Sequence, residues 1–261
     1  TSYSLSRGAP SASWVLPQVQ SSYMIAHCGV LVKNRIDFLL KMMYALHMRY
    51  DTVIFDLDGT LLDTLDDLTD GVNHALADFG YPLATREQIR ARLGYGSKYL
   101  ISESVPGGYD DPNYQAVFDD YLAFYRAHSS VKTGPYPGVM ALLGRLKARG
   151  VRCAIVSNKP DAAARELGER WFGGLVATTV GDREGIRRKP APDTLLEVMR
   201  QLGAAPERTV YIGDSEVDIE TAKAAGGDCI SVTWGFRTRE QLIASGASLL
   251  AADAAELENA L

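Results

Sequence analysis

The chain contains few residues that could form disulfides or a histidine metal site. None of its four histidines has the spacing of a metal ligand. Only three cysteines, Cys28, Cys153 and Cys229, occur among 261 residues, and no two of them are closely spaced. Cys153 and Cys229 fall in apolar segments that we predict to be strands, which favours core thiols over reactive ones. Such sparse, unpaired cysteines favour a reducing compartment, so we expect a cytoplasmic protein.

Long apolar runs and an excess of positive charge are also absent. No stretch reaches the roughly 18 consecutive apolar residues that a transmembrane helix requires. The formal net charge of −5 disfavours nucleic acid or an acidic membrane surface as the main partner. With 46% hydrophobic and 23% charged residues, the chain can bury an α/β core and a small second domain. The composition therefore agrees with a soluble enzyme and predicts neither nucleic acid nor a membrane as partner.

One apolar segment ends in two acids. It begins at Asp51 with the sequence DTVIFDLDGT, in which a β-branched run leads to Asp56 and Asp58 and then to glycine. Side chains alternate along a strand, which puts both carboxylates on the same side, and ligands bind beyond the carboxyl ends of parallel strands. Two like charges held this close are costly unless a divalent cation, a proton or a phosphoryl group uses them. A solvated strand end with acidic residues is the alternative.

Three further segments complete a pattern with the first. In chain order they are residues 151–159 (VRCAIVSNK), 188–193 (RKPAPD) and 210–218 (VYIGDSEVD). They carry Ser157, Lys189, and the acids Asp214 and Asp218. Together the four segments resemble, in the same order, the four motifs of the haloacid dehalogenase superfamily, whose phosphotransferase members carry Asp-x-Asp-Gly-Thr after the first strand. The resemblance covers essentially everything from Met48 to Leu261.

The resemblance and the periodicity together predict the fold. After residue 150, strand and helix patterns alternate, including a strand near Val176 and a helix from Ile219, which predicts a parallel sheet with crossover helices. Residues 65–135 instead show apolar residues at helical spacing. An all-helical insertion after the first catalytic strand is the placement of the cap in the subgroup of phosphoglycolate phosphatases and β-phosphoglucomutases. We therefore expect a Rossmann-like, doubly wound α/β core of residues 48–64 and 136–261, with residues 65–135 as a helical cap domain.

The resemblance also implies roles for the acids. Asp56 would be the nucleophile that forms an aspartyl-phosphate, and Asp58 would be the general acid and base. Mg²⁺ prefers hard oxygen ligands, which Asp56, the backbone carbonyl of Asp58, and Asp214 would supply. Asp218 would orient metal-bound water rather than bind the metal. The alternative for Asp218 is an acid that the dipole of the following helix favours.

Three residues outside the acids are implied to bind the phosphoryl group. Ser157 and the backbone amide of Asn158 would hydrogen-bond its oxygens, and Lys189 would offset the crowded negative charge. Ser157 could instead cap the helix that begins near Asp161. Lys189 lies in a basic run, residues 187–189, which on its own would be typical of a solvated loop.

The predicted cap contains a glycine-rich loop, residues 93–98 (LGYGSK). Gly94 and Gly96 would let this loop rearrange over the site, and Lys98 would offer its charge to a second anionic group of the substrate. The alternative is an ordinary connection between two helices, with Lys98 on the surface.

We expect a Mg²⁺-dependent phosphatase for a small phosphorylated metabolite, because residues 63–68 and 157–161 resemble bacterial phosphoglycolate phosphatases. A β-phosphoglucomutase-like enzyme is the main alternative, and relatives with similar motifs act on pyrophosphate, nucleotides or sugar phosphates. The dehalogenase branch lacks the second acid that Asp58 supplies, which disfavours it. The complete set of acids and Lys189 disfavours a non-enzymatic interaction protein. The chain is expected to be a monomer or homodimer.

Residues 1–47 do not belong to this pattern. Residues 1–22 are polar, Ser-rich and without periodicity, and the family-like chain would begin naturally at Met48. We favour an upstream translation start or a cloning artefact over a native segment. A short helix that Asn34 caps, docking to a partner subunit, is the alternative.

Overall fold

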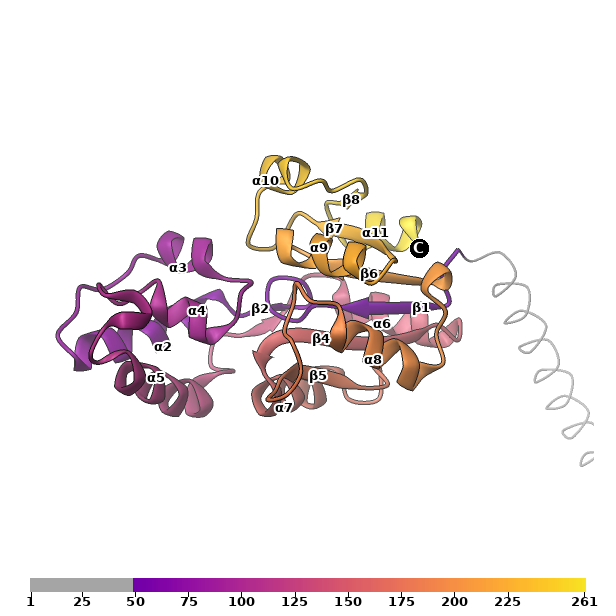
Figure 1. Cartoon of the computed structure of the whole chain (residues 1–261). Coiled ribbons are helices and arrows are strands. Elements are labelled where there is room, and N and C mark those ends of the chain that lie inside the picture. Colours follow the sequence, from indigo (N-terminus) through magenta and orange to yellow (C-terminus); the bar gives the residue numbers. More distant parts are fainter. Residues whose placement is uncertain (1–48) are drawn as a thin grey trace, which may run out of the picture. The chain divides into compact units, whose positions relative to one another are not determined.

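Parallel strands form a central sheet in the computed structural model, which describes residues 49–261 (Figure 1). Its six strands within that range are β1 (Thr52–Phe55), β4 (Arg152–Pro160), β5 (Thr179–Asp182), β6 (Thr209–Gly213), β7 (Asp228–Val232) and β8 (Leu250–Ala251). Their order is β5-β4-β1-β6-β7-β8, so β1 lies inside the sheet between β4 and β6. All four residues of β1 are buried, as expected for a parallel strand covered on both faces. Our predictions for residues 1–47 lie outside the described residues.

Helices cover both faces of this sheet. They are α6 (Val139–Ala148), α7 (Asp161–Phe172), α8 (Asp193–Leu202), α9 (Glu216–Ala224) and α11 (Ala254–Ala260), and the chain also forms α10 (Arg239–Ala244) and the 3-10 turn η2 (Pro206–Arg208). Successive residues of β1 point to opposite faces. Val53 and Phe55 share an apolar core with α6, α7 and α11, whereas Ile54 shares another with α8 and α9. The predicted Rossmann-like, doubly wound α/β fold is therefore confirmed.

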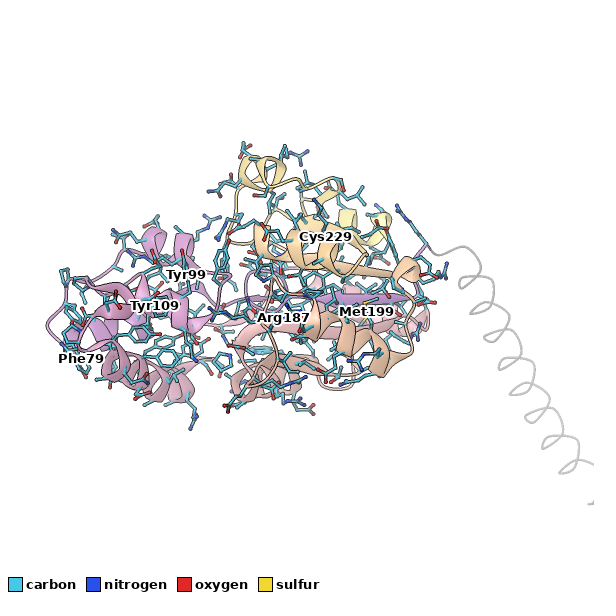
Figure 2. The ribbon with its side chains drawn as sticks, viewed as in Figure 1. Phe79, Tyr99, Tyr109, Arg187, Met199 and Cys229 are labelled. Carbon is cyan, nitrogen blue, oxygen red and sulfur yellow. The ribbon has the colours of Figure 1, made fainter. Side chains whose placement is uncertain are left out.

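Residues 65–128 form a separate group of helices. Its elements are α2 (Leu65–Asp78), α3 (Arg86–Arg92), α4 (Ser97–Ser102), the 3-10 turn η1 (Gly108–Asp110) and α5 (Tyr114–His128). These helices bury their own apolar cluster, in which Val72 of α2 meets Val117 and Tyr121 of α5. In Figure 1 they gather at the end of the sheet to which the arrow of β1 points. In Figure 2, the labelled Phe79, Tyr99 and Tyr109 belong to this group of helices.

Two short strands join the helical group to the sheet. β2 (Leu62–Asp63) leads out of the sheet and β3 (Gly134–Pro135) leads back, and the two pair antiparallel. Buried Asp67 accepts backbone hydrogen bonds from Lys132 and Thr133, which ties the start of α2 to the returning chain. Residues 48–261 form one compact unit, so the boundaries of a separate cap domain stay a prediction.

Two elements differ from their predicted positions. Val176 lies in the loop after α7, where it packs on the apolar core, and β5 begins only at Thr179. α9 begins at Glu216, three residues before the predicted Ile219, because Asp218 accepts the backbone hydrogen bond of Ser215 and completes the first turn. Within residues 49–261, no helix has both the length and the apolar character needed to cross a bilayer.

Candidate active site

The carboxyl ends of β1, β4 and β6 bring the predicted site residues together. Asp56 follows β1, Ser157 lies near the end of β4, and Asp214 follows β6. Because the three strands are parallel neighbours, these residues meet at one edge of the sheet. Asp56, Ser157 and Asp214 are all buried, although each is polar. The arrangement therefore concentrates polar groups that an ordinary strand end would leave in solvent.

Three acids form the negative part of this site. One carboxylate oxygen from each of Asp56, Asp214 and Asp218 lies within 4.8 Å of the others. Burial raises the pKa of Asp56 to about 7, and the nearby Asp218 and Asp58 carboxylates add to that effect while Lys189 opposes it. Burial, with Asp218 and Asp56 nearby, also raises the pKa of Asp214 well above its usual range. Removing a proton from this cluster is costly unless a cation takes its place.

Asp214 is held firmly on both of its carboxylate oxygens. Oδ1 accepts a hydrogen bond from the Thr60 hydroxyl at 3.1 Å, and Oδ2 accepts one from the backbone N–H of Phe236 at 2.7 Å. Two glycines make room for it. A Cβ on Gly59 would lie 2.4 Å from Oδ2 of Asp214, and a Cβ on Gly235 would lie 2.4 Å from its Cβ. The backbone thus encloses this carboxylate so closely that its position is defined without any ligand.

Lys189 supplies the balancing positive charge. Its Nζ lies 3.0 Å from Asp56 Oδ1, 2.8 Å from Asp218 Oδ1 and 2.9 Å from the hydroxyl of Tyr211. Burial lowers the pKa of Lys189, but the carboxylates of Asp218 and Asp56 outweigh burial and hold that pKa well above its usual value. The side chain is only 2% exposed, so Lys189 does not lie in a solvated loop.

Asp218 is committed to contacts within the protein. Its Oδ2 accepts the backbone N–H of Asp214, the N–H of Ser215, and the Ser215 hydroxyl at 2.6 Å, while Oδ1 binds Lys189. The acid lies beside the candidate metal ligands and also in the first turn of α9, so both of its predicted roles stay predictions. Its most direct effect is to orient Lys189 and the loop that carries Asp214.

Ser157 and Asn158 lie in the same pocket but make different contacts. Ser157 does not cap a helix, since Pro160 is the residue that precedes α7. The Oγ of Ser157 instead accepts a hydrogen bond from the backbone N–H of Lys159 at 3.3 Å. The Asn158 amide nitrogen donates to the carbonyl of Gly94 at 2.9 Å and to the carbonyl of Lys189 at 3.0 Å. The Asn158 side chain therefore ties the glycine-rich loop of the helical group to the loop that carries Lys189.

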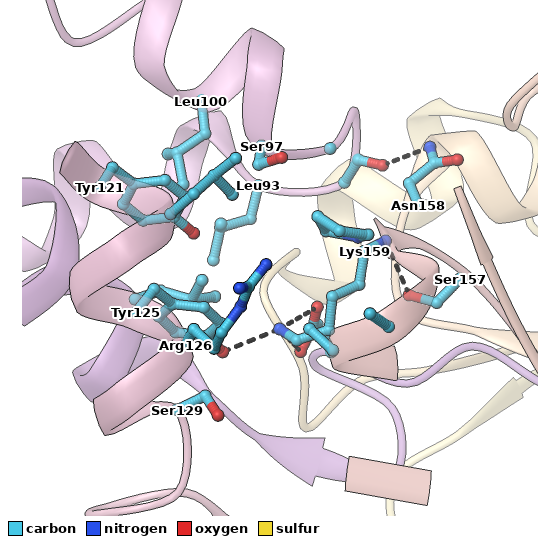
Figure 3. Close-up of a pocket in the computed structure, with 18 of the residues that line it drawn as sticks. Leu93, Ser97, Leu100, Tyr121, Tyr125, Arg126, Ser129, Ser157, Asn158 and Lys159 are labelled. Carbon is cyan, nitrogen blue, oxygen red and sulfur yellow. Dashed lines mark hydrogen bonds and ion pairs between the residues drawn. The ribbon is translucent and has the colours of Figure 1, made fainter. Parts of the chain in front are cut away.

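Lys159 is a site residue that our motif analysis did not single out. Its Nζ lies 3.0 and 3.1 Å from the two carboxylate oxygens of Asp58 and 2.8 Å from the hydroxyl of Tyr125 (Figure 3). The side chain is only 2% exposed. The sequence did contain one signal for it, a lysine at the end of an apolar strand. Lysine is almost never buried without a partner, so such a position indicates an ion pair. Lys159 thus links Asp58, the predicted general acid and base, to Tyr125 of α5.

A pocket of about 140 Å³ opens between the sheet and the helical group. We call its polar side the sheet wall, which consists of Asp56, Asp58 and residues 157–159. We call the opposite side the helical wall; its lining includes Leu68, Leu93, Gly96, Leu100, Tyr121, Leu122, Tyr125 and Arg126. Figure 3 shows the two walls facing each other, with Arg126 projecting from α5 toward the sheet wall.

The glycine-rich loop meets only part of our expectation. Gly96 lines the pocket at a φ of 86°, and a Cβ there would lie 2.9 Å from the carbonyl oxygen of Asn158. Lys98 lies in α4, is exposed, and is not part of the pocket lining. The structure thus places Lys98 on the surface, as the alternative expected, but within α4 rather than in the connection before it, and does not bring Lys98 to the pocket.

Two arginines join the helical group to the loop after β7. Arg90 of α3 donates to the backbone carbonyls of Phe236 at 2.8 Å and Gly235 at 2.9 Å. Arg237 donates in the opposite direction, to the carbonyl of Leu93 at 2.8 Å, and also pairs with Glu216. Since Phe236 donates its N–H to Asp214, this loop touches both the candidate metal site and the helical group.

Carboxylates that converge with a buried lysine at the carboxyl edge of a parallel sheet can bind a cation and a phosphoryl group. The family model for haloacid dehalogenase-like hydrolases matches residues 53–232, and the chain belongs to that family. The predicted family and the predicted class of enzyme, a phosphatase, are thereby confirmed.

Curated relatives and solved structures agree with this assignment. The chain is 37% identical over 190 residues to phosphoglycolate phosphatase 1 of Pseudomonas aeruginosa, covering 70% of each chain. It is 34% identical over 206 residues to a phosphoglycolate phosphatase of Pseudomonas putida, covering 77% of this chain and 76% of the relative. The crystal structure of a proposed phosphoglycolate phosphatase from Lactobacillus delbrueckii superposes with a TM-score of 0.76 at 37% identity, covering 82% of this chain and 98% of that one. The chain is thus a phosphatase similar to phosphoglycolate phosphatases.

Proposed function

We propose that this phosphatase hydrolyses phosphoglycolate, or a phosphomonoester of similar size, through a phosphorylated Asp56. The observation that carries the proposal is the pair of carboxylates, Asp56 and Asp58, facing one small pocket from the end of β1. The likeness to phosphoglycolate phosphatases at 34% and 37% identity supports the choice of substrate.

The first half-reaction transfers the phosphoryl group to the protein. A carboxylate oxygen of Asp56 bonds to phosphorus while the bond from phosphorus to the alcohol oxygen breaks, and Asp58 donates a proton to that leaving oxygen. Lys189, already beside Asp56, offsets the negative charge of the two reacting groups. Ser157 and Asn158 line the sheet wall, where the Ser157 hydroxyl and the Asn158 backbone amide would hydrogen-bond the phosphoryl oxygens.

The second half-reaction restores the enzyme. Asp58, now ionised, takes a proton from a water molecule as that water attacks phosphorus and displaces the Asp56 carboxylate. The products are inorganic phosphate and the free alcohol. Lys159 supports Asp58 in this exchange, because its ammonium contacts both carboxylate oxygens and is itself held by the hydroxyl of Tyr125 on α5.

The acidic cluster fits a divalent cation, and we propose Mg²⁺. Besides its ion pair with Lys189, buried Asp56 Oδ1 has no hydrogen-bond partner, and the cluster holds more carboxylates than ammonium groups. Asp56 and Asp214 would hold the ion, with the backbone carbonyl of Asp58. When bound, Mg²⁺ would neutralise charge on the phosphoryl group.

The size of the pocket supports a small substrate. Its volume of about 140 Å³ is close to that of a cavity of about 150 Å³ that accommodates benzene. A phosphorylated two- or three-carbon acid suits such a space better than a hexose phosphate or a nucleotide. This observation disfavours the β-phosphoglucomutase and nucleotidase alternatives.

The test compares two aspartates from the same stretch of sequence. Asp56→Asn removes the nucleophile, whereas Asp63→Asn changes an exposed carboxylate outside the pocket. Phosphate release from phosphoglycolate is measured with Mg²⁺ and again with excess chelator. We expect a loss of kcat of about 10⁴-fold or more for Asp56→Asn, little change for Asp63→Asn, and no turnover without the metal. Substantial activity in Asp56→Asn, or indifference to the chelator, would contradict the mechanism.

A further inference from the structure

We propose that Arg126 binds a second anionic group of the substrate, so that the pocket selects phosphomonoesters whose alcohol carries a carboxylate or a comparable anion. This inference rests on the proposed function and assigns its selectivity to one side chain of α5. It replaces the expectation that Lys98 performs this task.

Among the described residues that line the pocket, Arg126 is the cation without an ion pair. It follows Tyr125 on α5, lines the pocket, and projects toward the sheet wall in Figure 3. Within residues 49–261, no carboxylate or carbonyl pairs with its guanidinium. Lys159 and Lys189 differ in this respect, because each holds carboxylates of the site at 2.8 to 3.1 Å.

The charges around the pocket leave room for one more anion. Asp58 would repel a substrate carboxylate, but the ammonium of Lys159 contacts both of its oxygens and offsets its charge. The exposed Glu166 of α7 also lines the pocket, but it forms no ion pair with Arg126, so the guanidinium stays open to a substrate anion. Among the residues that line the pocket, an entering anion therefore meets one cation without an ion pair, Arg126, and a guanidinium binds a carboxylate through two parallel hydrogen bonds.

The rest of the helical wall explains why this contact would select substrates. Around Arg126 the wall presents Leu68, Leu100, Tyr121 and Leu122, and Phe236 adds a further apolar side chain. Such surfaces cannot replace the water that a carboxylate loses on entering the pocket, so an anionic alcohol binds well only if Arg126 pairs with it. A neutral alcohol of the same size would gain nothing from Arg126.

A matched pair of substrates separates charge from shape. 2-Phosphoglycolate and its amide, 2-phosphoglycolamide, have nearly the same size, but only the first carries a carboxylate. Arg126→Gln removes the cation and Arg126→Lys retains it without the two-pronged geometry. Lys98→Ala is the control, since Lys98 is an exposed cation of the same helical group that does not line the pocket.

We expect Arg126→Gln to lower kcat/KM for 2-phosphoglycolate by about 10-fold or more, mainly through a higher KM. A loss of this size corresponds to one hydrogen bond to a charged group. Turnover of the amide should change by less than about threefold, Arg126→Lys should lie between wild type and Arg126→Gln, and Lys98→Ala should match wild type. All assays use one ionic strength, because exposed charges are screened by salt.

Three results would overturn the inference while the proposed function stands. They are equal losses on acid and amide in Arg126→Gln, a selective loss in Lys98→Ala instead, and a wild-type enzyme that hydrolyses the amide as well as the acid. A wild-type enzyme that hydrolyses neither compound nor any other small phosphomonoester would instead refute the proposed function, and this inference with it.

Discussion

The sheet wall and the helical wall of the pocket are built on opposite principles. On the sheet wall, Asp56 and Lys159 are buried and paired at about hydrogen-bond distance with groups of opposite charge. The helical wall is mainly apolar, and its one cation, Arg126, is exposed and unpaired among the described residues. In the proposed mechanism, the reacting groups are therefore fixed before the substrate arrives, whereas substrate selection depends on one side chain that forms its ion pair only with the substrate.

The most disruptive test of this comparison removes Lys189, the buried cation that pairs with Asp56 of the sheet wall. Lys189→Met leaves the carboxylates of Asp56 and Asp218 buried without their ammonium partner. Breaking a buried pair in this way typically costs about 3–5 kcal/mol of folding free energy. Urea unfolding of the metal-free protein measures the loss.

Arg187→Met is the matched control, because Arg187 lies two residues away in the same loop and is 77% exposed in its pair with Asp193 (Figure 2). We expect a much smaller change for this variant. Similar losses for the two variants would mean that the sheet wall does not depend on its buried charge network.

The second test uses pH and metal to probe the same wall. In the metal-free protein, the pKa of Asp56 rises from its ordinary value of 3.8 to about 7, so the folded state binds more protons than the unfolded state between these values. Stability of the metal-free protein should therefore fall as pH rises from about 4 to about 7. Mg²⁺ needs ionised carboxylates, so its stabilising effect should grow over the same interval, to about 2.7 kcal/mol where the ion is at 100 times its Kd.

Thermal unfolding with and without Mg²⁺ at pH 5.5 and pH 8 measures this difference. Asp214→Asn serves as the control, since it removes a proposed metal ligand and should abolish the shift in Tm at both pH values. A shift in Tm that is equal at the two pH values, or that persists in Asp214→Asn, would argue against a metal on this acidic cluster.

The smallest expected effect concerns the loop where the two walls touch. Gly96→Ala places a Cβ 2.9 Å from the Asn158 carbonyl oxygen at a φ of 86°, so it adds a clash to the strain of a left-handed residue. We expect a loss of about 1–2 kcal/mol and a raised KM, because the loop must move away from Asn158. Chemical denaturation and steady-state kinetics measure the two effects.

Gly80→Ala isolates the backbone strain in the last test. Gly80 has a φ of 69° and open space where a Cβ would lie. Any loss of stability in this variant therefore comes from the left-handed backbone conformation alone. An unchanged KM in both variants would show that the contact between Gly96 and Asn158 does not shape the pocket.

Strand ends could be predicted from the sequence far better than the helical wall. Asp56, Lys189 and Asp214 were located because each lies in a short motif whose spacing is local, and the sheet brings the motifs together at its carboxyl edge. Their catalytic roles, the metal ligands and the oligomeric state stay predictions.

The helical wall depends on packing between helices, which residue spacing alone does not specify. Lys98 and Arg126 both lie on helices of the insertion, and only the arrangement of α4 and α5 decides which of them faces the pocket. Tyr121 and Tyr125 lie on the buried face of α5, and Arg126 lies at the margin of that face. Lys159 was overlooked for a related reason, because its partners Asp58 and Tyr125 are distant in sequence.

The reciprocal arginine contacts bear on how this insertion could be exchanged between relatives. Arg90 contacts the carbonyls of residues 235 and 236, and Arg237 contacts the carbonyl of Leu93. The helical group and a loop more than 100 residues away in sequence therefore have to be exchanged together. A chimera whose imported helices lack an arginine at position 90 would lose the hydrogen bonds to the carbonyls of residues 235 and 236 and would disturb Phe236, whose N–H holds Asp214. A chimera designed for a new substrate specificity should therefore include residues 235–237 from the same relative as the helices.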